Sequence, residues 1–171
     1  ARRVIVLGVD PGIGTTGFGV VEQKTLNSFV YVDCGCLKTP PRTPLEQRLL
    51  QLSNEFGELL DKVKPDAAAV EKLFFGRNVT TAFAVGQARG VLLLELARRH
   101  IPMAEYTPPQ VKQAVAGYGA AKKKQVQTMV QRLLNLNKVP RPDDAADALA
   151  IALCHGFSAR LVNLAARAKM A

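Results

Sequence analysis

The stretch VIVLGVDPGIGTTGFGVV, residues 4–21, contains the two segments on which the expected fold depends. Its first part, VIVLGVD (4–10), is short, apolar and rich in β-branched residues, which predicts a buried strand. The turn PGIGTTG follows, with a proline and three glycines, and FGVVEQ then reads as a second strand. With SFVYVDCGCL as a third strand, residues 4–37 are expected to form an antiparallel meander.

The rest of the chain alternates helical and extended patterns. Leucine, phenylalanine and valine recur at spacings of three and four over residues 45–63, which predicts a helix lying on a sheet. Strands are expected at 67–75 and 101–106, and further helices at 79–100, from PPQVKQAV, over 122–136 and from the aspartates at 143 to about 157. This order predicts an α/β fold with a mixed sheet.

Bulk composition is typical of one globular domain. The chain has 171 residues, of which 48% are apolar and 22% charged. No apolar run approaches the roughly 18 residues of a membrane span, and the start lacks a cleavable signal. Three cysteines make no disulfide framework. We therefore expect a cytoplasmic protein without a membrane partner, with one domain over residues 1–157 and a basic tail over 158–171.

The positive charge is concentrated in the C-terminal part. The net charge is +9, and residues 106–171 hold ten lysines and arginines but only three acids, Asp143, Asp144 and Asp147. A basic surface around an acidic spot suits a polyanion that meets a cation-binding site. A merely basic protein is the plain alternative.

The expected topology can bring four carboxylates close together. Asp10 closes the first strand and Glu71 lies near the end of the fourth. If these strands are parallel neighbours, both side chains project from the same sheet edge. Asp144 and Asp147, three apart, share one helix face that can reach this edge. Taken singly, Asp10 suits a turn and Asp144 a helix start. The prediction of a shared site therefore depends on the four carboxylates lying close together.

A cluster of four carboxylates would be stabilised by bound cations. Unit charges 4 Å apart repel by about 4 kcal/mol at an effective dielectric near 20. Oxygen ligands without assembled histidine or cysteine favour Mg²⁺, with Mn²⁺ able to substitute. Two such ions are suited to phosphoryl displacement.

Five segments resemble the RuvC family of Holliday-junction resolvases, which has the ribonuclease-H-like fold. They are LGVDPGIGTTGFGVV, AAAVEKLFF, AVGQARGVL, PPQVKQAVAGYGAAKKKQVQ and DDAADALAIAL, together spanning about residues 4–154. The resemblance implies a five-stranded mixed sheet, its first three strands antiparallel. It also implies a catalytic tetrad of Asp10, Glu71, Asp144 and Asp147 that binds two Mg²⁺ ions.

The resemblance implies partners as well. It points to a homodimer that nicks four-way DNA junctions symmetrically, leaving 5′-phosphate and 3′-hydroxyl ends, and that works beside the RuvA–RuvB branch-migration complex. The helix at 79–100 is apolar on much of its circumference, which makes it the candidate dimer interface. Burial under the chain's own tail is the alternative.

The expected DNA contacts follow the same resemblance. Lys112 and Lys123 are expected to hold the scissile phosphate, Lys123 as part of the catalytic set, and Phe74 to stack on an unpaired base. Core packing of Phe74, or of its neighbour Phe75, is the structural alternative. Further expected backbone contacts are Arg77, Arg89, Lys122 and Lys124.

Three rival functions share some of these features. The opening GVDPGIGTTGFGVV also resembles the first phosphate loop of actin-like and sugar-kinase ATPases, although the chain is about half the length they need. A DNA-binding module that does not cut lacks a use for the carboxylates. Another ribonuclease-H-like nuclease, acting on RNA–DNA hybrids, shares both fold and metal chemistry.

Overall fold

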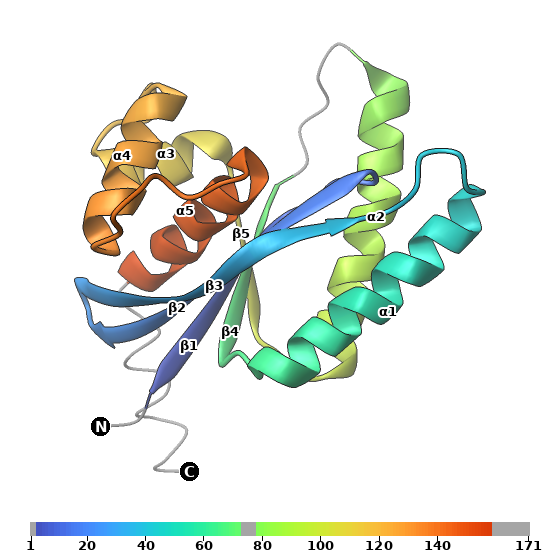
Figure 1. Ribbon diagram of the computed structural model, residues 1–171, viewed down its shortest axis with the longest axis horizontal. Helices are drawn as coiled ribbons and strands as arrows, with labels where there is room; N and C mark the ends of the chain where they lie inside the picture. The colour runs from blue at the N-terminus through green and yellow to red at the C-terminus, as the bar shows by residue number, and fades with distance from the viewer. Residues whose placement is uncertain (1–2, 73–77, 159–171) are drawn as a thin grey trace.

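One five-stranded sheet forms the centre of the molecule, with helices on both faces (Figure 1). The computed structural model describes residues 3–72 and 78–158. Its elements are β1 (Val4–Asp10), β2 (Thr15–Thr25), β3 (Ser28–Lys38), α1 (Leu45–Val63), β4 (Ala67–Glu71), α2 (Val79–Arg98), β5 (Met103–Tyr106), α3 (Pro108–Ala116), α4 (Lys123–Leu133) and α5 (Asp143–Phe157).

The sheet order is β3-β2-β1-β4-β5, and the expected mixed topology is confirmed. β1 pairs with β2, and β2 with β3, in antiparallel fashion. β1 pairs in parallel with β4, and β4 with β5. The strand expected at 67–75 ends at Glu71 within the described residues, so Glu71 is its last residue.

Strand alternation divides the apolar residues between two cores. Leu7 and Val9 of β1 face α1 and α2, where they join Phe56 and Leu92. Val6 faces the opposite side, where α5 covers the sheet and α3 and α4 pack outside it. Figure 1 shows these two groups of helices on opposite sides of the strands. Both faces of β1 are therefore buried, as its continuous apolar run indicated.

Helix α2 has two apolar faces. Ala88, Leu92 and Leu96 are buried against α1 and the sheet, whereas Phe83 and Leu94 are 67% and 54% exposed. Among the described helices, α2 is the one that is long and apolar enough to cross a membrane by length and composition. Its inner face packs as a core helix does, but only 28% of that apolar stretch is buried in the single chain.

The main helix of the other face, α5, lies with its backbone directly on the sheet. Gly8 of β1 and Gly19 of β2 are cross-strand neighbours. A Cβ atom on Gly8 would lie 2.0 Å from the Ala148 carbonyl oxygen, and one on Gly19 would lie 2.5 Å from the Leu149 nitrogen. Only glycine leaves room for this contact, and the alanines of α5 complete it from the helix side.

We expect the substitution Gly8→Ala to destabilise the protein by about 1–3 kcal/mol, the usual cost of overpacking a tight core. The added methyl group meets helix backbone, which cannot rotate away. Urea denaturation measures the free energy of unfolding. Gly14→Ala is the matched control, because its Cβ atom would make only an ordinary 3.7 Å contact with Arg48. Equal effects of the two substitutions would contradict the close-packing argument.

Candidate metal centre

Strand alternation places the first two carboxylates on the α5 face of the sheet. Asp10 is two residues beyond Gly8, whose side faces α5, and Glu71 is two residues beyond Ala69, which lies in the α5 core. The parallel register pairs Val9 with Val70, so the next position along brings Asp10 beside Glu71. Both are the last residues of their strands: Asp10 was expected to close its strand, whereas Glu71 was expected near the end of a longer one.

The start of α5 supplies the other two carboxylates. Asp144 lies in the first turn and Asp147 one turn further, on the same face. Gly17, the β2 residue paired with Asp10, again permits the approach, because a Cβ atom there would lie 2.1 Å from the Asp144 carbonyl oxygen. The aspartates are thus held over the ends of β1 and β2.

These side chains form one acidic cluster. Carboxylate oxygens of Asp10, Asp144 and Asp147 all lie within 4.8 Å of one another. Glu71 adjoins Asp10 closely enough to hydrogen-bond to it when one of the two is protonated. The convergence expected from the sequence is therefore present in the structure, and all four donors are oxygens.

Electrostatics shows that this cluster is short of positive charge. Burial, then the neighbouring Glu71 carboxyl, raises the pKa of Asp10 to about 9. Burial also raises the pKa of Asp147, with the charges of Glu71 and Asp144 adding to the effect while Lys123 opposes it. A divalent cation would remove this repulsion, so the donor set fits the oxygen-binding metals that the sequence predicted.

Lys123, at the start of α4, reaches the edge of the cluster. Its Nζ lies 3.6 Å from Asp147 and 3.3 Å from Asp143. Burial works against its charge, but Asp147 and Asp143 outweigh burial and raise the pKa of the ammonium group. Lys123 is therefore held in its charged form beside the carboxylates, with its side chain still 55% exposed.

Asp143, the first residue of α5, makes contacts beyond those of a helix start. Besides Lys123, it accepts hydrogen bonds from Arg141 Nη1 at 2.7 Å and from Gln127 Nε2 at 3.2 Å. It thus anchors Lys123 and ties α4 to α5. Lys123 and Asp143 are distant in the sequence, and no local pattern indicated their pairing.

Arg89 of α2 has partners inside the protein. Its Nη2 lies 2.7 Å from Glu105 Oε1, and its Nε donates to the Glu71 carbonyl oxygen at 3.4 Å. With a side chain only 15% exposed, Arg89 fastens α2 to the end of β4. The structure thus gives it a positioning role that the sequence did not reveal, and its contact with DNA stays a prediction.

The other expected contacts lie around the cluster or outside the described residues. Phe74 and Arg77 belong to residues 73–77, which are not described. Lys112 is half-buried on α3 and, within the described part of the chain, forms no ion pair. Lys122 and Lys124 are exposed on either side of Lys123.

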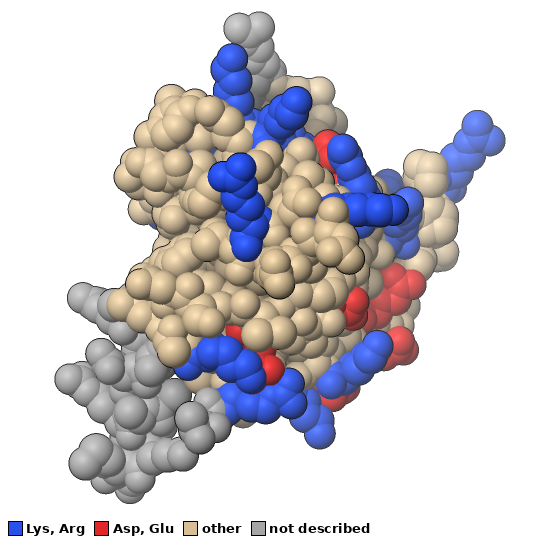
Figure 2. Space-filling model, turned by 60° about the vertical axis from the view of Figure 1, so that its left-hand side comes forward, with Lys and Arg blue, Asp and Glu red and all other residues tan. Residues whose placement is uncertain are grey.

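The surface on the side of α3, α4 and α5 is rich in basic side chains. Figure 2 turns this side forward: lysine and arginine side chains stand along its upper part and its lower edge, and acidic side chains lie at its right and lower margins. Such a surface attracts a polyanion toward the carboxylates.

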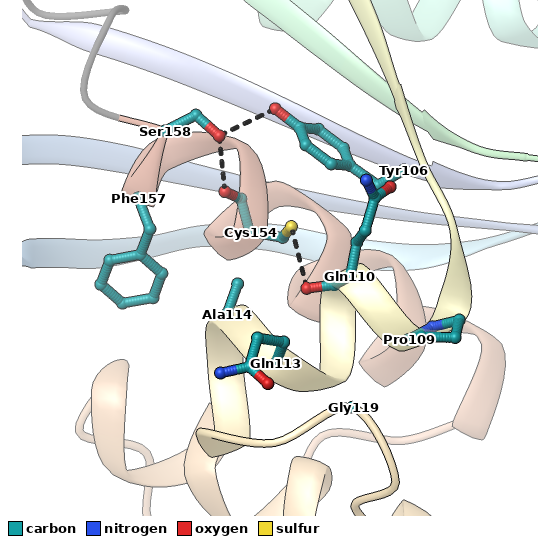
Figure 3. A pocket seen from close by; sticks show the side chains of 9 residues that line it. All are labelled: Tyr106, Pro109, Gln110, Gln113, Ala114, Gly119, Cys154, Phe157 and Ser158. Atoms are coloured by element: carbon teal, nitrogen blue, oxygen red, sulfur yellow. Dashed lines mark hydrogen bonds between the residues drawn. The ribbon is translucent and has the colours of Figure 1, made fainter.

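A separate hollow between α3 and α5 lacks that charge. It has a volume of about 600 Å³, and its lining includes Tyr106, Gln110, Cys154 and Ser158 but no charged residue (Figure 3). The Tyr106 hydroxyl contacts Ser158 Oγ at 3.0 Å and His155 Nδ1 at 2.7 Å. This hollow contains none of the four carboxylates.

A mixed sheet whose ends gather carboxylates from β1, β4 and α5 defines a ribonuclease-H-like protein with a candidate site for divalent cations. The family model described as crossover junction endodeoxyribonuclease RuvC matches residues 6–155. The chain belongs to the RuvC family.

Individual relatives agree over nearly the whole chain. The RuvC of Chloroflexus aggregans is 58% identical over 153 residues, covering 90% of this chain and 93% of the relative. That of Desulfitobacterium hafniense is 52% identical, covering 94% and 96%. The solved structure of Thermus thermophilus RuvC in complex with Holliday junction substrate is 41% identical, with a TM-score of 0.88 and coverage of 93% and 96%.

We expect the metal-free protein to lose stability as pH rises from 7 to 8.5. The folded state keeps a proton on Asp10 up to about pH 9, whereas the unfolded chain releases it near pH 4. The folded state therefore binds more protons, and stability falls by at most about 1.4 kcal/mol per pH unit for this group. Urea denaturation in EDTA measures the fall, and added Mg²⁺ should reverse it.

Asp10→Asn should flatten this pH dependence, because the amide does not titrate. Asp61→Asn is the matched control: Arg99 lowers the pKa of Asp61, whose titration therefore lies well below the measured range. His155 is also outside it, because burial lowers its pKa to about 4. An equally steep fall in Asp10→Asn would rule out Asp10 as the source.

Proposed function

We propose that this protein is an endonuclease that resolves four-way DNA junctions by paired, symmetric nicks in recombination and repair. The observation that carries the proposal is the meeting of Asp10, Glu71, Asp144 and Asp147 beside Lys123, in a chain of the RuvC family. The Thermus thermophilus relative was solved with a Holliday junction, which supports junctions as the substrate class. Residues 1–157 are taken as one nuclease domain, and the tail over 158–171 is given no role.

The four carboxylates are proposed to hold two Mg²⁺ ions, which Mn²⁺ can replace. Their all-oxygen donor set and the raised pKa of Asp10 both favour a bound divalent cation. When bound, such ions activate a water molecule and stabilise the leaving oxygen of the phosphodiester, giving 5′-phosphate and 3′-hydroxyl ends.

Lys123 is proposed to contact the scissile phosphate. Asp143 and Asp147 hold its ammonium group near the carboxylates, so its positive charge is in place before the charge of the transition state develops. Lys112, on the neighbouring α3, is proposed to bind the same phosphate. Phe74 and Arg77, which follow β4 along the chain, are proposed to contact DNA next to the cut.

Two such sites require two copies of the chain. Symmetric nicks need active sites related by a two-fold axis, and the outer face of α2 offers a self-complementary apolar surface. Val79, Phe83 and Leu94 are 69%, 67% and 54% exposed on this helix. We propose that α2 packs against its counterpart in a homodimer, which acts in the cytoplasm beside the RuvA–RuvB branch-migration complex.

We expect cleavage of a four-way junction with Mg²⁺, and little cleavage of a linear duplex or an RNA–DNA hybrid of the same sequence. Asp10→Asn and Glu71→Gln should abolish cutting while junction binding persists, because metal ligands are lost but the basic surface is kept. Gel cleavage assays and fluorescence anisotropy measure the two properties. Preferential cutting of the hybrid would favour the rival nuclease function, and ATP binding without junction binding would favour the ATPase.

Lys123→Ala should slow single-turnover cleavage by about 10²-fold, the usual effect of removing one stabilising group from a transition state. Circular dichroism should show an unchanged fold, because the side chain lies at the surface. The exposed Lys138 provides a charge-matched control, since Lys138→Ala removes the same charge from the loop that follows α4. If both substitutions slow cleavage to a similar degree, Lys123 contributes only to the overall positive charge and does not contact the scissile phosphate.

Phe83→Glu and Leu94→Glu should each shift the protein to a monomer in analytical ultracentrifugation and reduce paired nicking. A buried charge at the centre of a dimer interface is strongly unfavourable. Leu50→Glu is the matched control, because Leu50 is 61% exposed on α1 and lies outside the α2 face. Dimers that persist in both α2 variants would place the interface elsewhere.

A further inference from the structure

A hollow of about 490 Å³ lies beside the start of α4. Ala116 and Met129 give it an apolar floor, while Tyr118, Lys122, Lys124 and Thr128 contribute polar groups around it. Its volume is within the range of roughly 300–1,000 Å³ typical of pockets for small ligands. We call it the tyrosine–lysine pocket.

The aromatic side chain of this pocket is both exposed and fixed in place. Tyr118 is 46% exposed, yet its hydroxyl donates a hydrogen bond of 2.6 Å to Gln125 Oε1. The same oxygen accepts from the Lys122 backbone N–H at 2.8 Å, as part of the cap of α4. The ring is thus oriented before any ligand arrives, so stacking on it costs little conformational entropy.

The pocket is also positively charged without internal compensation. Lys122 and Lys124 form no ion pair with any residue in the described part of the chain, and the first turn of α4 contains no acid. The N-terminal end of α4 adds its own partial positive charge. The hollow between α3 and α5 has no charged lining at all, so this charge distinguishes the tyrosine–lysine pocket.

Lys123 connects the pocket to the metal centre. It lies between the two pocket lysines in sequence but reaches Asp143 and Asp147 at 3.3 and 3.6 Å. Consecutive residues of a helix point about 100° apart, so Lys122 and Lys124 point to either side of Lys123, and Gln125, Thr128 and Met129 place the pocket on the side of α4 away from the carboxylates. A strand whose phosphate lies at Lys123 reaches the pocket by passing around the N-terminal end of α4, a path of a few nucleotides because a helix is about 10–12 Å across.

We propose that the tyrosine–lysine pocket receives one unpaired nucleotide of the junction strand near the cut. The base stacks on the Tyr118 ring, and the two phosphates that flank this nucleotide are held by Lys122 and Lys124. This inference deepens the proposed function and rests on it, because it identifies a subsite for that same substrate.

The chemistry of the pocket favours an unpaired nucleotide over duplex DNA. Stacking on an aromatic side chain needs a base face that is free of its neighbours, whereas bases within a duplex are stacked on both sides. Every base has such a face, so the pocket tolerates any sequence. Duplex DNA would use the lysines alone and leave Tyr118 without a contact.

The decisive experiment removes the base and the ring separately and together. Junctions carrying one abasic site, moved one position at a time away from the cut, are bound to protein with the Asp10→Asn substitution so that cutting cannot interfere. At one position the missing base should weaken binding about tenfold, as expected when one stacked base is removed. The same abasic junction should be bound no more weakly than the intact one when Tyr118→Leu is added, because the ring is already gone.

Two further variants separate stacking from folding. Tyr118→Phe keeps the ring and removes the hydroxyl, so it should retain the abasic effect. Tyr118→Leu keeps apolar volume, and its thermal unfolding should stay close to that of the parent. The abasic site and Tyr118→Leu could instead weaken binding independently, so that their fold-reductions in affinity multiply at every position. That result would overturn the base-stacking proposal.

The lysines are tested through the salt dependence of binding. The double substitution Lys122→Ala and Lys124→Ala should reduce the slope of log Kd against log salt by about 2, because two phosphates are no longer neutralised by a lysine. Lys62→Ala with Lys64→Ala removes the same charge at the end of α1, across the sheet, and should leave the slope unchanged. Equal slopes for the two double variants would overturn the phosphate-binding role.

The outcomes also separate this proposal from the one on which it rests. If the wild-type protein cuts junctions but the abasic cycle shows no coupling at any position, the pocket proposal fails while the nuclease function stands. If the wild-type protein cuts no junction, the nuclease proposal has failed.

Discussion

The close approach of the α5 backbone to the sheet is the constraint on which the rest of the structure depends. Gly8 and Gly19 face each other across β1 and β2, and α5 occupies the space that their side chains would need. Gly17 does the same beside Asp10. Without this approach, the two aspartates of α5 would lie a side chain's width further from the strand ends, and a shared cation would have too few ligands.

The same close approach of α5 to the sheet places several carboxylates near one another in a partly buried site, where their charges repel. Burial beneath α5, and then the closeness of the other carboxylates, raises the pKa of Asp10 and Asp147, which means that the charged cluster opposes folding. Lys123 relieves part of it, and a divalent cation is suited to relieve the rest. Without a metal ion, the acidic cluster therefore lowers the stability of the folded protein, and the same cluster is suited to bind a divalent cation.

The sequence predicted the class of fold and the carboxylates because both depend on local patterns. Apolar runs, glycine turns and helical spacing located the strands and helices, and Asp10 and Glu71 were recognisable as acids at strand ends. The pairing of Asp143 with Lys123 and of Arg89 with Glu105 joins residues far apart in the chain, so periodicity carries no trace of it. The role of Gly8 and Gly19 could not be predicted either, because these strand residues contact a helix more than a hundred residues later in the chain.

Arg89 links helix α2 to the end of β4 that carries Glu71. Its guanidinium reaches both Glu105 and the carbonyl group of Glu71, while Phe83 and Leu94 on the same helix face outward. A displacement of that helix therefore acts on the backbone of Glu71, whose side chain belongs to the acidic cluster. Whatever packs on the outside of α2 is in this way coupled to the position of one of the four carboxylates.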